Sequence, residues 1–229
     1  SVIDMVRVLV PHNNESRESL INEKLAMECE KMCRGLVKKG YEITLNFACF
    51  NHVTEEELDL VMNKVSDLPI KCVYIADTYG NLKEFDMIDQ IDRLNKYKCR
   101  VGLHLHDFKR DALAKVKMGL KHESTLMIDS CVNGLGRGLG NLKSEILFLE
   151  LGKSYESLFD YSSKKYDNKK ELLYALSANL DIHPDFVKDL LTTELNILDS
   201  IQILKEIKFK TNRSNKKNYH KNMVSEINN

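Results

Sequence analysis

The sequence predicts an α/β fold of the (β/α)8, or TIM, barrel type, followed by a small C-terminal helical region. Two observations predict it. Short apolar runs rich in β-forming residues recur at steps of about 25 to 37 residues, and the segments between them carry helical periodicity. Polar motifs follow three successive runs, at the strand ends where a barrel places its active site. The five runs are residues 5–10, 41–47, 72–76, 100–105 and 126–128.

The segments between the runs predict amphipathic helices. Apolar residues at helical spacing form two stripes, which are Ile21, Leu25, Cys29, Met32 and Leu36 in the first and Ile88, Ile91 and Leu94 in the second. Capping patterns predict two helix starts. Thr54 with Glu57 makes a capping box, and Asn81 with Glu84 makes an asparagine-capped variant of it.

Five strands do not close a barrel, which needs eight strands and typically about 250 residues. Because the chain enters its first strand within a few residues of Ser1, the simplest interpretation places three βα units before it. The five runs are then strands four to eight of the barrel. An open, doubly wound sheet is the competing fold, and it needs no further strands.

Composition divides the chain into three parts. Residues 1–153 alternate between strand and helix patterns and correspond to the C-terminal part of a barrel domain. Residues 154–207 form a helical region, with apolar stripes and no strand pattern from about residue 168. Residues 208–229 hold six Lys or Arg, six Asn and one acidic residue. This last composition predicts a disordered polar tail that folding does not need.

Composition also argues against several classes of protein. The 229 residues are 43% hydrophobic and 30% charged, as is typical of a globular chain. No apolar run approaches the roughly 18 residues of a membrane-spanning helix. The 34 basic residues balance 34 acidic ones, which disfavours a nucleic-acid partner. The six cysteines form no CxxC pair, so we predict reduced thiols and a cytoplasmic location.

Two histidines lie two residues apart in the fourth apolar run. Strand geometry puts His104 and His106 on one face with Gly102, while apolar side chains occupy the other face. Two imidazoles are costly inside a protein unless hydrogen bonds or a metal satisfy them. A divalent metal site and a polar barrel layer without metal both fit this pattern. The chain lacks a cysteine cluster, which disfavours structural zinc.

Polar motifs follow the neighbouring runs. Asp77 and Thr78 begin a turn directly after the third run, where an Asp commonly binds backbone amides. The glycine-rich segment 134–140 follows the fifth run and ends before Asn141, which we place at a helix start. Its pattern excludes a dinucleotide fingerprint, because a Leu occupies position 139. Arg137 in this loop is suited to a carboxylate or phosphate, and a flexible turn is the alternative.

These motifs, in this order, resemble those of the DRE-TIM metallolyase family, and most of all its 4-hydroxy-2-oxovalerate aldolase branch. The resemblance covers about residues 4–150. It implies that His104 and His106 bind a divalent metal, Mn²⁺ foremost and otherwise Mg²⁺ or Co²⁺, with Asn141 as a further oxygen ligand. Asp77, Thr78, Arg137 and Gly138 are implied at the substrate, and Tyr174 is a candidate catalytic base in the helical region.

The resemblance implies an aldolase that cleaves a 4-hydroxy-2-oxo acid into pyruvate and an aldehyde. A synthase that condenses an acyl-CoA with a 2-oxo acid is an alternative within the family, and a non-catalytic binding protein is an alternative outside enzymes. The family's first-strand Asp-Arg-Glu motif has no match in this sequence, so activity is expected once strands one to three are present. A dehydrogenase or a second copy of the chain is the expected partner, through the helical region.

Overall fold

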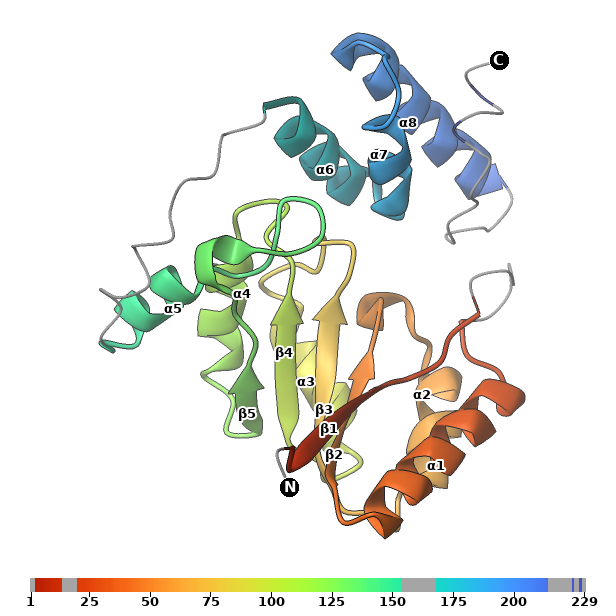
Figure 1. The fold of residues 1–229 in the computed structure, drawn as a ribbon, viewed down its shortest axis with the longest axis vertical. Helices are drawn as coiled ribbons and strands as arrows, with labels where there is room; N and C mark the ends of the chain where they lie inside the picture. Colours follow the sequence, from red (N-terminus) through yellow and green to blue (C-terminus); the bar gives the residue numbers. More distant parts are fainter. Residues whose placement is uncertain (1–2, 14–19, 154–167, 214–223, 225–226, 228–229) are drawn as a thin grey trace. The chain divides into compact units, whose positions relative to one another are not determined.

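The computed structural model (Figure 1) describes residues 3–13, 20–153, 168–213, 224 and 227. The chain forms two compact units. The first unit comprises residues 1–78, 82–104 and 114–129, and the second comprises residues 79–81, 105–113 and 130–229. The first unit holds nearly the whole sheet. The second holds the loops after three of the strands together with the C-terminal helices.

A five-stranded parallel sheet forms the first unit. Its strands are β1 (Met5–Leu9), β2 (Glu42–Phe47), β3 (Ile70–Asp77), β4 (Val101–Leu105) and β5 (Thr125–Ile128), in that order across the sheet. Each strand lies within two residues of the run that predicted it. Among the described residues these strands leave the sheet open rather than closing it into a barrel. A strand order without a switch point excludes the doubly wound alternative.

The connecting helices cover one face of the sheet (Figure 1). They are α1 (Glu23–Lys38), α2 (Glu55–Lys64), α3 (Met87–Asn95) and α4 (Ala112–Gly119). Right-handed crossovers between parallel strands in sequence order place every such helix on the same side. At Gly119, a Cβ atom would lie 2.6 Å from Leu103 Cδ1, so the glycine lets α4 approach β4 closely. We call the opposite face of the sheet the inner face.

The sheet is strongly curled. Its two edge strands would lie about 19 Å apart in a flat sheet, from a strand spacing of about 4.8 Å. Arg7 on β1 nevertheless forms a bidentate ion pair with Asp129, which directly follows β5. The two side chains meet across the inner face, so the five strands follow an arc, as strands of a barrel do.

One predicted helix start is confirmed and the other is wrong. Thr54 caps α2 with the complete capping box, and the buried Glu57 carboxylate also accepts the backbone N–H groups of residues 20 and 21. Helix α3 begins at Met87, after Asp86, instead of after Asn81. The Asn81 amide donates to the Asp181 carboxylate, so a partner 100 residues away takes the side chain that we expected to cap the helix.

Helices dominate the second unit. They are α5 (Ser144–Glu150), α6 (Asn168–Leu180), α7 (Asp185–Leu190) and α8 (Ile197–Arg213), with short 3₁₀ turns at Val132–Gly134 here and Phe50–His52 in the first unit. Their apolar side chains bury one cluster, which includes Phe108, Leu173, Tyr174, Phe186 and Leu204. The helical pattern predicted from residue 168 is therefore present.

The C-terminal tail differs from the prediction where the structure describes it. Helix α8 continues past residue 207 to Arg213, and Thr211 within it is buried. Val224 is also buried, in the apolar cluster of the second unit. Residues 154–167, 214–223, 225–226 and 228–229 lie outside the described residues. In the part of the chain that the structure describes, no helix has the length and apolar character needed to cross a membrane.

Candidate functional site

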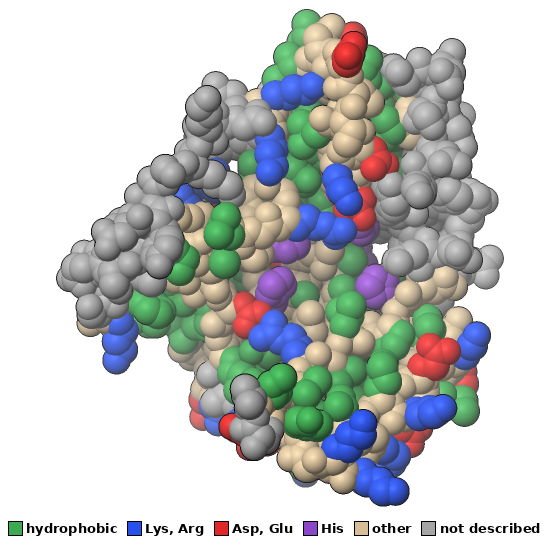
Figure 2. All heavy atoms as spheres, in the orientation of Figure 1, with side chains coloured by type: hydrophobic (Ala, Val, Ile, Leu, Met, Phe, Trp, Pro, Cys, Tyr) green, Lys and Arg blue, Asp and Glu red, His purple; other side chains and the backbone are tan. Residues whose placement is uncertain are grey.

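Four side chains form a polar group on the inner face, which we call the inner-face cluster: Arg7, Tyr74, His104 and Asp129. His104 Nδ1 lies 2.7 Å from Asp129 Oδ2, and both Asp129 oxygens also accept from the Arg7 guanidinium. Burial opposes the charge on Asp129, but the bonds from His104 and Arg7 outweigh it and lower the pKa of this carboxyl. Figure 2 shows an acidic side chain beside basic and histidine side chains over the strands.

The inner-face cluster depends on a glycine. Gly102 precedes His104 by two residues and faces the Tyr74 ring, and a Cβ atom there would lie 2.6 Å from that ring. Without a side chain at position 102, the ring lies against β4 and supports Arg7, whose guanidinium carbon is 3.8 Å from the ring centroid. Burial, with the Asp129 charge next, raises the pKa of Tyr74 to about 12. Its hydroxyl is therefore protonated near neutral pH.

Strand β2 adds buried polar atoms to the inner face. Thr44 pairs in register with Arg7 on β1, and Asn46 pairs with Tyr74 on β3. Thr44 Oγ1 and Asn46 Oδ1 are buried, and neither has a hydrogen-bond partner among the described residues. Buried polar atoms ordinarily find a partner in protein, water or ligand. The middle of the inner face is therefore suited to polar ligands.

Asp77, predicted at the substrate, lies in a fully buried ion pair. One of its oxygens accepts from Lys115 Nζ at 2.9 Å and the other from the Leu82 N–H at 3.2 Å. Both charged side chains are 0% exposed. Thr78 Oγ1 accepts from the Cys49 N–H at 2.8 Å. This geometry supports a role for Asp77 and Thr78 in holding the turn after β3, rather than in direct contact with substrate.

His106 lies in the second unit beside Asn141. The two residues form an isolated antiparallel bridge, and the His106 ring stacks on Phe108 with centroids 5.0 Å apart. The Asn141 amide donates to the Leu135 carbonyl at 3.2 Å, while its buried Oδ1 has no hydrogen-bond partner among the described residues. That oxygen fits the further ligand implied by the resemblance. Helix α5 begins only at Ser144, so Asn141 does not start it.

Tyr174 lies on α6 next to the same aromatic ring. Its ring centroid is 5.0 Å from that of Phe108, and its side chain is buried in the apolar cluster of the second unit. Burial raises the pKa of Tyr174, and nearby Arg137 only partly opposes that effect. The phenol therefore keeps its proton near neutral pH. This environment supports a hydrogen-bond donor rather than the catalytic base that we predicted.

The glycine-rich loop has the unusual backbone that its sequence predicted. Gly138 has a positive φ of 66°, and a Cβ atom there would lie 2.7 Å from the Tyr174 ring. At Gly140 a Cβ atom would overlap the Gly134 carbonyl oxygen at 1.8 Å. Arg137, predicted to bind a substrate carboxylate, instead contacts Asp185 of α7 at 2.6 Å. The loop therefore already holds one carboxylate, supplied by the protein.

The described residues meet part of the requirement for a metal site. Within them, no group of three or more His, Cys, Asp or Glu side chains is arranged to hold a metal ion. His104 individually fits a ligand role, because histidines that bind metals generally hold a carboxylate through the other ring nitrogen. The buried Asn141 oxygen is a suitable further donor. Each of these donors, taken by itself, is of a type that suits a divalent ion.

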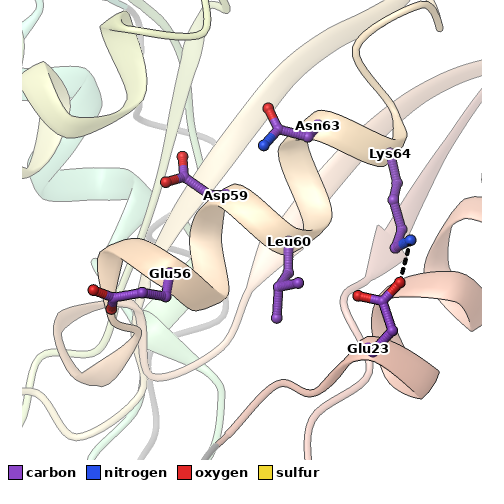
Figure 3. Close-up of a pocket in the computed structure, with 6 residues that line it drawn as sticks. All are labelled: Glu23, Glu56, Asp59, Leu60, Asn63 and Lys64. Carbon is purple, nitrogen blue, oxygen red and sulfur yellow. Dashed lines mark ion pairs between the residues drawn. The ribbon is translucent and has the colours of Figure 1, made fainter.

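A surface hollow lies apart from these groups. It has a volume of about 450 Å³ on α1 and α2, the helices on the other side of the sheet from the inner face (Figure 3). Its lining residues are Glu23, Glu56, Asp59, Leu60, Asn63 and Lys64. Lys64 already pairs with Glu23 at 2.6 Å. The hollow contains no histidine or cysteine, and we assign it no role in the site.

Sequence reasoning missed three charged residues of the first unit. Asp129 directly follows a strand, as Asp77 does, and this position was its available signal. Arg7 lies in an otherwise apolar strand, where a charged residue needs a partner. Lys115 is fully buried although it lies in a helix, and nothing in the sequence distinguishes it from a solvent-exposed lysine. Each becomes evident only when its partner is known.

A parallel sheet in sequence order, covered on one face by its connecting helices and carrying polar residues at its strand ends, defines a chain of the TIM-barrel class. Solved structures share this fold. A hydroxymethylglutaryl-CoA lyase from Pseudomonas aeruginosa matches with a TM-score of 0.57 and 18% identity, over 76% of this chain and 68% of that one. An N-terminal domain from Bacteroides vulgatus matches with a TM-score of 0.65 and 19% identity, over 88% and 67%.

The chain belongs to the HMGL-like family, whose model matches residues 12–164. The resemblance to DRE-TIM metallolyases is thereby confirmed. A 4-hydroxy-2-oxovalerate aldolase from Geobacillus genomosp. 3 is 29% identical over 121 residues, which are 52% of this chain and 36% of the relative. Another from Chloroflexus aurantiacus is 30% identical over 115 residues, or 49% and 33%. The chain thus spans about a third of the length of the curated relatives that it matches.

Proposed function

We propose that this chain carries the metal-binding half of a divalent-metal-dependent carbon–carbon lyase, which cleaves a 4-hydroxy-2-oxo acid into pyruvate and an aldehyde. The observation that carries the proposal is the bond between His104 Nδ1 and Asp129, because histidines that bind metals generally hold a carboxylate through the nitrogen that does not bind the metal. Membership of a lyase family and similarity to proteins named 4-hydroxy-2-oxovalerate aldolase support the reaction class.

The five strands are assigned to strands four to eight of the barrel. The curl that brings Arg7 to Asp129 supports this assignment, because strands four and eight lie opposite each other in an eight-stranded barrel. The first strand also shows features of an open edge. Met5 and Leu9 of β1 share the inner face with Arg7 and are 37% and 53% exposed, as apolar side chains are where further strands of a closed barrel would cover that face.

His104, His106 and Asn141 are the residues assigned to the metal, Mn²⁺ foremost, with Mg²⁺ or Co²⁺ as alternatives. Such an ion supplies Lewis acidity toward a 2-oxo acid. Residues of the chain supply orientation and protons. Asp129 holds the His104 ring, and the protonated Tyr174 phenol is suited to hydrogen-bond a substrate oxygen. Arg137 and the Gly138 amide are assigned to a substrate carboxylate, since a guanidinium has donors beyond those facing Asp185.

The test is a pyruvate-release assay coupled to lactate dehydrogenase, on the protein that carries strands one to three, with 4-hydroxy-2-oxo acids as substrates. Pyruvate should form only with a divalent ion, and His104→Ala and His106→Ala should each abolish its formation. His122→Ala is the matched control, because His122 also lies beside a carboxylate, that of Asp92, at 3.3 Å, but precedes β5 at the amino ends of the strands. This variant should keep the activity.

Two other outcomes would replace the proposal. Release of free CoA thiol from an acyl-CoA and a 2-oxo acid, without pyruvate formation, would establish the condensing synthase. Stable binding of the metal with neither activity, in a protein that carries the first-strand Asp-Arg motif, would favour the non-catalytic binding protein. Unchanged pyruvate release in both histidine variants would contradict the assignment of His104 and His106.

A further inference from the structure

We propose that Arg7 and Asp129 are positioning residues that fix His104 in the tautomer with the proton on Nδ1. The inference deepens the proposed function and rests on His104 as a metal ligand. It starts from a feature of the whole sheet. Arg7 comes from β1 and Asp129 follows β5, so an ion pair between the two edges of the sheet holds a histidine on the strand between them.

The hydrogen bonds determine where the proton lies. Two guanidinium nitrogens of Arg7 donate to the two oxygens of Asp129, one of them at 2.8 Å. A carboxylate that faces a guanidinium in this way stays ionised and can only accept hydrogen bonds. His104 Nδ1, at 2.7 Å from Asp129 Oδ2, must therefore donate. A neutral imidazole then carries its lone pair on Nε2, which is the nitrogen that binds a metal.

The position of Arg7 is itself set by its surroundings. The Tyr74 ring lies 3.8 Å from the guanidinium carbon, and the Tyr74 hydroxyl is 3.2 Å from Met127 Sδ. Gly102 leaves room for that ring against β4. Four of the five strands therefore contribute to the orientation of one imidazole: β1, β3, β4 and β5. A change in the curl of the sheet would move Arg7 relative to Asp129 and so change the orientation of the His104 ring.

The partial exposure of these side chains distinguishes a positioning role from a purely structural one. The side chains of Arg7, His104 and Asp129 are 34%, 27% and 22% exposed. Partly exposed ion pairs contribute little to folding free energy. Loss of one partner is far more costly in a fully buried pair such as that of Lys115 with Asp77. The inner-face cluster instead leaves part of its histidine side chain exposed to solvent.

The primary test reads the tautomer directly and needs neither metal nor activity. Long-range ¹H–¹⁵N spectra of the ¹⁵N-histidine-labelled protein, with His104 assigned through His104→Gln, should show a proton on Nδ1. Arg7→Met and Asp129→Asn should shift His104 toward the Nε2–H form. Lys71→Met is the control, because it removes an exposed ion pair between β3 and Glu42 on β2 that lies apart from the cluster. It should leave the His104 signals unchanged.

A second measurement titrates Mn²⁺ into the same proteins. Arg7→Met and Asp129→Asn should weaken Mn²⁺ binding about 10- to 100-fold, as loss of a ligand's supporting carboxylate generally does. Arg7→Lys keeps the charge and loses the bidentate geometry, so it should fall between wild type and Arg7→Met. This variant keeps the test valid if Arg7→Met fails to fold.

The outcomes separate the two proposals. An Nδ1–H tautomer that persists in both Arg7→Met and Asp129→Asn overturns the positioning role, whatever the metal does. A tautomer shift in those variants, in a protein that carries strands one to three and still binds no Mn²⁺, supports the positioning role and refutes the metal-dependent lyase. A tautomer shift accompanied by weaker Mn²⁺ binding supports both.

Discussion

Two aspartates of the first unit lie at equivalent places in the sequence and have different surroundings. Asp77 is the last residue of β3, and Asp129 directly follows β5. Asp77 is fully buried against Lys115, with a backbone N–H on its other oxygen. Asp129 is partly exposed and joins Arg7 to His104. A carboxylate at a strand end therefore takes its role from its partners, and its place in the chain does not decide that role.

The two sites also differ in what they contribute energetically. Removing one member of a buried ion pair leaves an uncompensated charge in a medium of low dielectric constant. When one member of a partly exposed pair is removed, water solvates the remaining charge and salt screens it, so little stability is lost. We therefore expect the Asp77 pair to govern stability and the Asp129 pair to govern ligand binding.

The largest expected effect is that of Asp77→Ala on stability. The change leaves Lys115 charged and buried, so the free energy of unfolding should fall by about 3–5 kcal/mol. Urea unfolding followed by circular dichroism measures it. The double variant Asp77→Leu with Lys115→Met removes both charges and should recover most of the loss. A loss below about 1 kcal/mol for Asp77→Ala would contradict the claim that the Asp77 pair matters more for stability than the Asp129 pair.

The next effect is that of Asp129→Ala on metal binding. The Kd for Mn²⁺ should rise about 10- to 100-fold, whereas the free energy of unfolding should fall by no more than about 1 kcal/mol. Calorimetric titration and urea unfolding give the two values on one preparation. If Asp129→Ala loses as much stability as Asp77→Ala and keeps its affinity for Mn²⁺, both aspartates have a structural role and the comparison is wrong.

A smaller effect is expected for Arg137→Met in the second unit. Its ion pair with Asp185 is exposed, with 42% of the arginine side chain accessible, so stability should change by less than about 1 kcal/mol. The KM for a 2-oxo acid substrate should rise while Mn²⁺ binding stays unchanged, because Arg137 is assigned to the substrate. Steady-state kinetics measure this. An unchanged KM would remove Arg137 from the site.

The smallest expected effect is on how the stability contributed by Asp129 depends on pH. Burial opposes ionisation of Asp129, but its bonds to His104 and Arg7 lower its pKa in the folded protein. Such a group contributes stability above its unfolded pKa, about 3.9, and loses the contribution as pH falls through the lower folded value. The difference in unfolding free energy between wild type and Asp129→Asn should therefore be full at pH 6 and shrink below about pH 4. A difference that grows on acidification would contradict this assignment.

Local patterns predicted much of the fold. The five strands lie where short apolar runs rich in β-forming residues indicated them, and the box of Thr54 and Glu57 caps α2 as expected. These features depend on residues close together in the sequence. The predicted cap at Asn81 failed for the opposite reason, because its side chain binds Asp181, far along the chain.

The inner-face cluster was only half predictable. Strand periodicity singled out His104, whereas Arg7 and Asp129 are 122 residues apart, and only the curl of the sheet brings them together. Lys115 illustrates the same limit, since a lysine in an amphipathic helix normally faces water and this one is buried. Asn141 was predicted from the glycine loop, but its oxygen lacks a partner among the described residues only because of where the amide donates.

Titration of Mn²⁺ into the purified protein tests the central claim most directly. In a protein that carries strands one to three as well, the wild type should bind one ion per chain, and the double variant His104→Ala with His106→Ala should bind none while keeping its circular dichroism spectrum. His122→Ala, which alters a histidine beside Asp92, should bind as wild type does. Unchanged occupancy in the double variant would contradict a metal site at these two histidines.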